Sequence, residues 1–373
     1  MGRVSRTRQQ DACPGALQTH RAADGALARI RLPGGMVTAG QLGALAAAAT
    51  EFGSATLELT GRGNVQIRGI TDTGAVARAV AAAGLLPSSS HERVRNIVSS
   101  PLSGRAGGLA DVRGWVGDLD EALCADPALA GLPGRFWFSL DDGRADVSTL
   151  AADAGVQVLD DGVALLLAGR DTGVRLEAGE AVPTLVTLAR RFVAIRENAW
   201  RVVELKDPSA LLEGFDAVAD VRLPIGDTAH PPVGWLPQDD GRVALGAAVP
   251  LGVLTARQAE FVAAIDAPVV VTPWRSLLIC DLDEGVADTA LRVLPPLGLV
   301  FDDTSDWLRV SACVGSPGCE RSRADVRADA ARAVRAGTPT GQVHFVGCER
   351  ACGRPRSGAV LVAAPDGYRP VVG

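Results

Sequence analysis

Two stretches of the chain share one pattern of apolar and polar positions. Residues 25–41 read Gly-Ala-Leu-Ala-Arg-Ile-Arg-Leu-Pro-Gly-Gly-Met-Val-Thr-Ala-Gly-Gln, and residues 241–258 repeat the pattern. Each stretch predicts a strand, a turn with Gly and Pro, and a helix that begins after a threonine cap, Thr38 or Thr255. A run of strand-like composition follows each helix, at 55–70 and at 268–282. Each copy is therefore half of an α+β unit.

The similarity between the two copies continues beyond these stretches. Gly84 and Arg95 are matched by Gly298 and Arg309, at the same separation of 214 residues. A constant separation over two segments argues against chance, so we infer a duplicated chain with its boundary near residue 220. Two pseudo-symmetric halves enclose a cleft, and ligand sites favour such interfaces.

Only the second half carries a cysteine motif. Five residues separate Cys313 from Cys319, and after 28 further residues three residues separate Cys348 from Cys352. The first pair is too wide for most zinc sites, whose pairs are usually two to four residues apart, so zinc is the weaker alternative. A helix is predicted over 320–336 and a strand over 342–346, between the two pairs. The motif predicts a [4Fe-4S] cluster on the four thiolates.

Composition narrows the class of ligand. The formal charge is −6 and the pI is near 5.4, so nucleic acid is not expected as a partner. No apolar stretch is long enough to span a membrane, and we expect a cytoplasmic protein. Lys206 is the only lysine, so nearly all basic residues are arginines. Arginine binds carboxylates through two parallel hydrogen bonds, which suits a ligand with several carboxylates.

Two further motifs accompany the cysteines. Residues 60–69 read Thr-Gly-Arg-Gly-Asn-Val-Gln-Ile-Arg-Gly, and residues 95–101 read Arg-Asn-Ile-Val-Ser-Ser-Pro. Together with the cysteine spacing and the duplication, they resemble the nitrite and sulfite reductase superfamily from about residue 12 to the C-terminus. The resemblance implies an α+β fold in which each half pairs a ferredoxin-like element with a larger nitrite/sulfite-reductase-like domain. The implied boundaries are 12–75, 76–220, 221–290 and 291–373.

The resemblance also implies a tetrapyrrole between the halves, with Cys352 the nearest of the cluster thiolates. Arg62 and Arg95 match the superfamily's anion-binding arginines, and Asn64 could add hydrogen bonds. Arg135 and Trp137 stand where sulfite reductases place two lysines that grip the inorganic anion. Tryptophan cannot supply a charge or a proton there, so reduction of sulfite or nitrite loses support.

A different branch of the superfamily, which oxidises precorrin-3A with dioxygen during aerobic cobalamin biosynthesis, is more similar. The similar segments are Ala-Cys-Pro-Gly at 12–15, Ser-Ser-Pro-Leu-Ser-Gly at 99–104 and Thr-Pro-Trp-Arg-Ser-Leu-Leu at 272–278. This resemblance implies hydroxylation at C20 with lactone formation, a mononuclear non-haem iron beside the cluster, and an external electron donor such as a ferredoxin or an NAD(P)H-dependent reductase. The arginines expected to clamp the substrate are Arg62, Arg95, Arg135 and Arg275.

Two alternatives stay open. The protein could be a sirohaem-dependent nitrite or sulfite reductase, or a tetrapyrrole-binding protein without catalytic activity. The ligands of a second iron are also open, because the sequence holds only His20, His91, His230 and His344. His91, followed by Glu92, is the preferred candidate among them.

Overall fold

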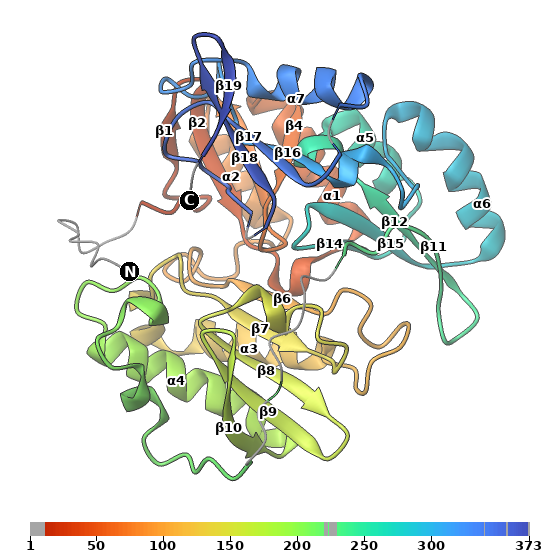
Figure 1. Cartoon of the computed structure of the whole chain (residues 1–373). Helices are drawn as coiled ribbons and strands as arrows, with labels where there is room; N and C mark the ends of the chain where they lie inside the picture. Colours follow the sequence, from red (N-terminus) through yellow and green to blue (C-terminus); the bar gives the residue numbers. More distant parts are fainter. Residues whose placement is uncertain (1–11, 220–222, 224–229, 339, 356, 372–373) are drawn as a thin grey trace.

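The computed structural model of the chain (Figure 1) describes residues 12–219, 223, 230–338, 340–355 and 357–371. The expected boundary between the halves, near residue 220, lies outside the described residues. The strands form four sheets, two of five strands in the centre, one of five in a domain below them, and one of four in a C-terminal domain.

The two central sheets are pseudo-symmetric and exchange strands. The first has the order β1 (His20–Ala22), β2 (Gly25–Ile30), β5 (Val65–Ile70), β4 (Thr56–Leu59) and β13 (Val253–Thr255). The second has the order β11 (Gly234–Pro237), β12 (Val243–Ala248), β15 (Ser276–Leu282), β14 (Val269–Val271) and β3 (Met36–Val37). Each sheet thus ends in a strand from the other half, antiparallel to its neighbour. The halves are joined by backbone pairing as well as by side chains.

Four helices pack with the central sheets in one apolar core: α1 (Ala39–Phe52), α2 (Thr73–Ala82), α5 (Ala256–Ala263) and α6 (Glu284–Val293). The predicted caps of α1 and α5 are confirmed. The Thr38 hydroxyl accepts from the Gln41 amide and the Gln41 side chain accepts from the Thr38 amide, and Thr255 and Gln258 repeat this capping box. The repeat in the sequence therefore corresponds to a repeat in the structure.

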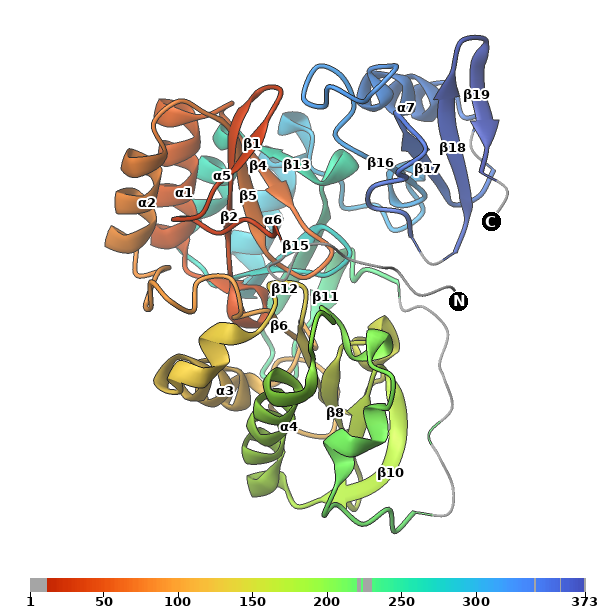
Figure 2. The same cartoon turned by 90° about the vertical axis from the view of Figure 1, so that its left-hand side faces the viewer.

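The two outer domains repeat one strand pattern as well (Figure 2). The domain of the first half contains β6 (Ile97–Ser99), β7 (Phe138–Asp141), β8 (Ala154–Leu159), β9 (Gly162–Leu167) and β10 (Arg170–Leu176), with α3 (Arg113–Ala125) and α4 (Ala181–Ile195). The domain of the second half contains β16 (Val310–Ala312), β17 (Val343–Val346), β18 (Ala359–Ala364) and β19 (Gly367–Pro370), with α7 (Val326–Arg335). In both, two parallel pairings are followed by antiparallel ones. The α+β fold of two pseudo-symmetric halves is confirmed.

One expected element differs in the structure. The helix expected over 320–336 begins only at Val326, because residues 320–325 form turns of the cysteine loop and Asp325 caps the helix by accepting from the Ala328 amide. Residues 154–219 hold three antiparallel strands followed by α4 and short turns. The strand within 342–346 is confirmed.

Short 3-10 turns connect these elements, at Pro33–Gly35, Pro127–Gly131, Ser148–Leu150, Ala178–Glu180, Val202–Glu204, Pro208–Leu212, Pro250–Gly252, Pro295–Leu297 and Asp306–Leu308. Within the described residues, none of the helices has the length and apolar character needed to cross a bilayer.

Candidate functional site

A cavity of about 950 Å³ lies where the first central sheet, the β6–β10 domain and the β16–β19 domain meet. Among the described residues, nine arginines line it, together with a single carboxylate, Glu58. The arginines are Arg29, Arg62, Arg68, Arg135, Arg201, Arg275, Arg327, Arg350 and Arg354. A cleft with one sign of charge concentrates ligands of the opposite sign, so this cavity suits a polyanion.

The sheet of the C-terminal domain brings the cysteine loops to one wall of the cavity. β16 and β17 are parallel neighbours, with Ala312 opposite Phe345, so the loops that follow them leave from the same edge. Cys313 begins the first loop and Cys348 the second. The Gly347 amide donates to Cys313 Sγ at 3.4 Å, and Cys313 and Cys352 line the cavity.

Cys352 is influenced by its burial and by the other three thiols of the motif. Burial raises the pKa of Cys352, and the thiols of Cys313, Cys348 and Cys319 raise it further. None of the four forms a disulfide. Four free thiols on two adjoining loops are a donor set that fits a [4Fe-4S] cluster.

His344, at the middle of β17, holds the second cysteine loop in place. Its ring is buried, Nε2 lies 2.9 Å from the Cys352 carbonyl oxygen, and Nδ1 lies 2.8 Å from the Ser311 hydroxyl. A carbonyl can only accept, so Nε2 carries the proton and Nδ1 accepts from Ser311. Burial lowers the pKa of His344, which favours this neutral form. No sequence motif marks this role, because one histidine inside an apolar strand resembles any core residue.

The first cysteine loop is fixed from the opposite side by β5. Arg68 Nη2 donates to the Gly318 carbonyl at 2.9 Å, while the same guanidinium pairs with Asp24 at 2.9 and 3.0 Å. Gly347 lies where a Cβ atom would be 1.8 Å from Ser322 Oγ, so only glycine lets the two cysteine loops approach there. These contacts pre-form the cysteine site.

Arg62 lies in the β4–β5 hairpin at the cavity wall. Its Nη1 donates to the Gly134 carbonyl at 3.3 Å, and its guanidinium lies 5.5 Å from the centre of the Trp137 ring. Arg201 lies 5.9 Å from the same ring. Burial, followed by the charge of Arg201, lowers the pKa of Arg62 to about 9. Two guanidinium groups that repel each other create a site in which an anion would be stabilised.

Arg135 and Arg275 also line the cavity, as predicted for ligand-facing residues. The Arg135 guanidinium lies 5.1 Å from the centre of the Trp200 ring. Arg275 lies in the β14–β15 hairpin, the counterpart of the hairpin that carries Arg62, so both halves supply an arginine from the same loop. Its φ of 60° is uncommon for a residue with a side chain, and burial lowers its pKa.

Asn64 lines the cavity, but its amide serves the fold. Oδ1 accepts from the Leu32 amide at 2.9 Å, and Nδ2 donates to Asn96 Oδ1 at 3.3 Å. Arg95 does not reach the cavity, which corrects its expected place among the ligand-facing arginines. It is buried, and Nε and Nη2 each donate to Asp120 at 2.6 Å. An arginine held by two short charge-assisted bonds is not available to a ligand.

The histidines considered for a second iron are dispersed. The ring nitrogens of His91 are both used, by the hydroxyls of Ser88 and Ser90 and by the Asp126 carbonyl, so the preference for His91 as an iron ligand is wrong. His20 lines the arginine cavity, whereas His230 lines a different one.

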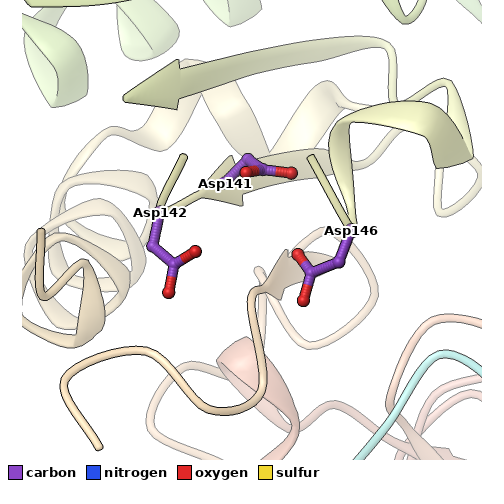
Figure 3. Close-up of side chains that lie close together, drawn as sticks. All are labelled: Asp141, Asp142 and Asp146. Atoms are coloured by element: carbon purple, nitrogen blue, oxygen red, sulfur yellow. The ribbon is translucent and has the colours of Figure 1, made fainter. Parts of the chain in front are cut away.

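One group of three acidic side chains, Asp141, Asp142 and Asp146, has the spacing of a metal site (Figure 3). Asp141 accepts from four backbone amides of the loop after β7, and Asp142 pairs with Arg144 at 2.7 Å. These oxygens are occupied, so the group organises a loop. Within the part of the chain that the structure describes, no such group contains a histidine.

Comparisons with known proteins agree with this fold. Residues 19–83 match the model of the nitrite/sulfite reductase ferredoxin-like half domain. The structure of the Mycobacterium tuberculosis NirA protein superposes with a TM-score of 0.71 and 20% identity, over 88% of this chain and 69% of that one. The resemblance to the nitrite and sulfite reductase superfamily is confirmed. The chain is 28% identical to a precorrin-3B synthase from a Sinorhizobium species, over 98% of this chain and 83% of that protein.

The similarity to nitrite reductases in sequence is shorter. A ferredoxin–nitrite reductase of Synechococcus elongatus is 33% identical over 34% of this chain and 27% of its own length. One from Leptolyngbya laminosa is 30% identical over 50% of this chain and 36% of its own length. Of these three relatives, the one matched over nearly the whole chain is thus the precorrin-3B synthase.

Proposed function

We propose that the protein is an oxygen-dependent monooxygenase that converts precorrin-3A into precorrin-3B. The observation that carries this proposal is a single cavity lined by nine arginines, with Cys313 and Cys352 at its wall. The similarity over 98% of the chain to a precorrin-3B synthase supports it. In this reaction one atom of dioxygen becomes a hydroxyl at C20, an acetate side chain closes as a lactone, and the second atom leaves as water. Two electrons and two protons complete the balance.

Cys313, Cys319, Cys348 and Cys352 would hold the [4Fe-4S] cluster. When bound, the cluster would supply electrons one at a time. The residues that the structure describes offer no histidine-containing ligand set for a second, mononuclear iron. The electrons come from a separate ferredoxin or NAD(P)H-dependent reductase. The segment Gly61-Arg62-Gly63 begins like a dinucleotide fingerprint, but β5 follows it where that fingerprint needs a helix.

The protein's own contribution is orientation. Arg62, Arg135 and Arg275 bind carboxylates at the rim of the macrocycle, and because they come from three different elements they fix its rotation in the cavity. His344 and Arg68 keep the cysteine loops in register with that ligand. A fixed macrocycle presents one carbon to the oxidant, which is what selective hydroxylation requires.

A sirohaem-dependent nitrite or sulfite reductase is the second candidate, and the partial similarities to nitrite reductases favour it. The residues at the cavity weigh against it. Trp137 is buried beneath Arg62 and Arg201, and the one lysine, Lys206, is exposed and paired with Glu197 at 3.4 Å. Arginine does not release its proton near neutral pH. Neither Trp137 nor the neighbouring arginines can therefore donate protons in place of the two lysines of the sulfite reductases. A non-catalytic tetrapyrrole-binding protein is the third candidate.

One set of measurements on anaerobically purified protein separates the three. We expect four irons and four acid-labile sulfides per chain, with any further iron belonging to the mononuclear site. The reduced protein should consume dioxygen only when precorrin-3A is present. Intense visible bands of a bound sirohaem would overturn the proposal in favour of a reductase. Binding of precorrin-3A without oxygen consumption would overturn it in favour of a carrier.

A further inference from the structure

Six of the nine arginines that line the cavity fall into two groups by their partners. Arg68, Arg201 and Arg327 each pair with a carboxylate, on Asp24, Asp153 and Glu58 respectively. Arg275, Arg350 and Arg354 make no side-chain hydrogen bond or ion pair with any residue that the structure describes. An anionic ligand would have to displace a carboxylate in order to bind an arginine of the first group. It can bind an arginine of the second group without displacing one.

Two members of the second group flank Cys352 in the sequence. Arg350 and Arg354 lie two residues on either side of Cys352, in turns closed by bonds from the Ala351 amide to the Cys348 carbonyl and from the Arg354 amide to the Ala351 carbonyl, both 3.1 Å. Both arginines are exposed and line the cavity, so they stand at its mouth.

Arg275 approaches the same loop from the second central sheet. A Cβ atom on Gly353 would lie 3.3 Å from Arg275 Nη2. Two arginines of the second cysteine loop and Arg275 from the second central sheet thus line the cavity together with Cys352.

We infer that Arg350 and Arg354 bind carboxylates of the tetrapyrrole directly, and that this shared charge makes ligand binding and reduction of the cluster antagonistic. The inference rests on the proposed function and adds two substrate-binding residues to it. One-electron reduction adds a negative charge beside these guanidinium groups, and a bound carboxylate neutralises the same groups. An occupied cavity therefore lowers the reduction potential of the cluster, and the reduced protein releases an anionic ligand more readily.

The link between the two arginines and the cysteine is one of position. Arg350 stands two residues before Cys352, and both residues line the cavity. A ligand that neutralises Arg350 therefore removes positive charge from the surroundings of Cys352. In functional terms, the cluster becomes a stronger electron donor when substrate occupies the cavity, so electrons are withheld from dioxygen in its absence.

The test is a redox titration of the holoprotein, followed by electron paramagnetic resonance, with and without a saturating polycarboxylate tetrapyrrole. Uroporphyrin I is the first probe, and precorrin-3A without dioxygen is the second. Dissociation constants are measured separately for the oxidised and the reduced protein. We expect about tenfold weaker binding to the reduced protein, which corresponds to a potential lowered by about 59 mV for one electron.

Variants assign the effect to the two residues. Substitution R350A/R354A should weaken binding at least tenfold and remove most of the ligand-induced shift. Substitution R350K/R354K keeps the positive charge. It should therefore retain more of the ligand-induced shift in reduction potential than of the affinity for the tetrapyrrole. R335A, at the exposed end of α7, is the matched control and should change neither quantity. Iron and sulfide content of each variant reports whether the cluster is intact.

The outcomes are distinct. Equal affinity of both probes for the two redox states, or an undiminished shift in R350A/R354A, would overturn the inference while leaving the proposed function intact. If neither probe binds the wild-type holoprotein, the cavity is not a tetrapyrrole site, and the proposed function falls together with the inference.

Discussion

Arg68 on β5 donates to the carbonyl of Gly318, 250 positions later in the chain, at 2.9 Å. The contact ties the first central sheet to the loop between Cys313 and Cys319. Its counterpart in the other half is the pair of Arg105 and Asp281, at 2.8 and 2.9 Å, which ties β15 to the metal-free loop of the first half. In both contacts, an arginine thus joins a central sheet to a loop of the other half. Only one of these two loops carries cysteines.

Substitution of Arg68 should therefore affect the cluster as well as stability. We expect Arg68→Ala to lower the free energy of unfolding by about 3 kcal/mol, because Asp24 loses its partner, and to reduce the iron bound per chain. Urea unfolding and iron analysis measure the two effects. Arg105→Ala breaks the equivalent contact, so it should cost similar stability but leave the iron content unchanged. Equal iron loss in both variants would contradict the assigned role of Arg68.

Arg62 and Arg95 provide a matched pair for ligand binding. Arg62 lines the cavity, whereas Arg95 is held by Asp120 away from it. Arg62→Ala should weaken tetrapyrrole binding by roughly 10- to 100-fold, the value of one charge-assisted contact, without changing cluster absorption. Arg95→Ala should lower stability and leave the dissociation constant near that of wild type. Fluorescence titration with uroporphyrin I measures both, and the opposite ranking would refute the placement of the ligand.

His344 should matter for retention of the cluster. In His344→Leu the Cys352 carbonyl and the Ser311 hydroxyl lose their partner, at a cost of about 1–3 kcal/mol. We expect faster loss of the cluster to a chelator, followed by its visible absorbance. His20→Leu is the control, because His20 is exposed and lines the cavity without a contact to the cysteine loops among the described residues. Unchanged kinetics in His344→Leu would show that the loop holds itself.

The loop after β7 predicts a pH dependence of stability. Burial, followed by the charge of Asp141, raises the pKa of Asp146 from 3.8 to about 7. The folded state therefore holds this proton more tightly than the unfolded chain, so the contribution to stability is complete below about pH 4 and is lost as the pH rises through 7. Between pH 4 and pH 8, the free energy of unfolding should change by about 3 kcal/mol less in Asp146→Asn than in the wild-type protein. Urea unfolding at several pH values measures this, and parallel curves for the two proteins would be the contrary result.

Local patterns in the sequence were enough to predict the repeat. The capping boxes at Thr38 and Thr255 and the strands that follow them depend on neighbouring residues, so they can be read from short segments. The exchange of β3 and β13 between the sheets could not be predicted. Met36 and Val37 form a two-residue strand whose partner, β14, lies more than 200 positions away, and no local pattern specifies that pairing.

Some residues of the candidate site could likewise be predicted from local sequence patterns, and others could not. The cysteine spacing is a local signal, and the parallel pairing of β16 and β17 brings the two loops that carry the cysteines to one edge of the sheet. Arg62 and Arg95 lie in equally distinctive motifs, yet only Arg62 lines the cavity. What separates them is Asp120, a partner 25 positions from Arg95 that the motif does not include. His344 and the arginines at 350 and 354 were missed because their roles depend on Cys352 and the cavity, which exist only in the folded chain.

The most direct test of the account uses isotopically labelled dioxygen. The reduced holoprotein is incubated with precorrin-3A and labelled dioxygen, and the tetrapyrrole is analysed by mass spectrometry. The account predicts a product that carries one labelled oxygen atom for each molecule of dioxygen consumed. An unlabelled tetrapyrrole, recovered unchanged while the same protein reduces nitrite or sulfite, would contradict it.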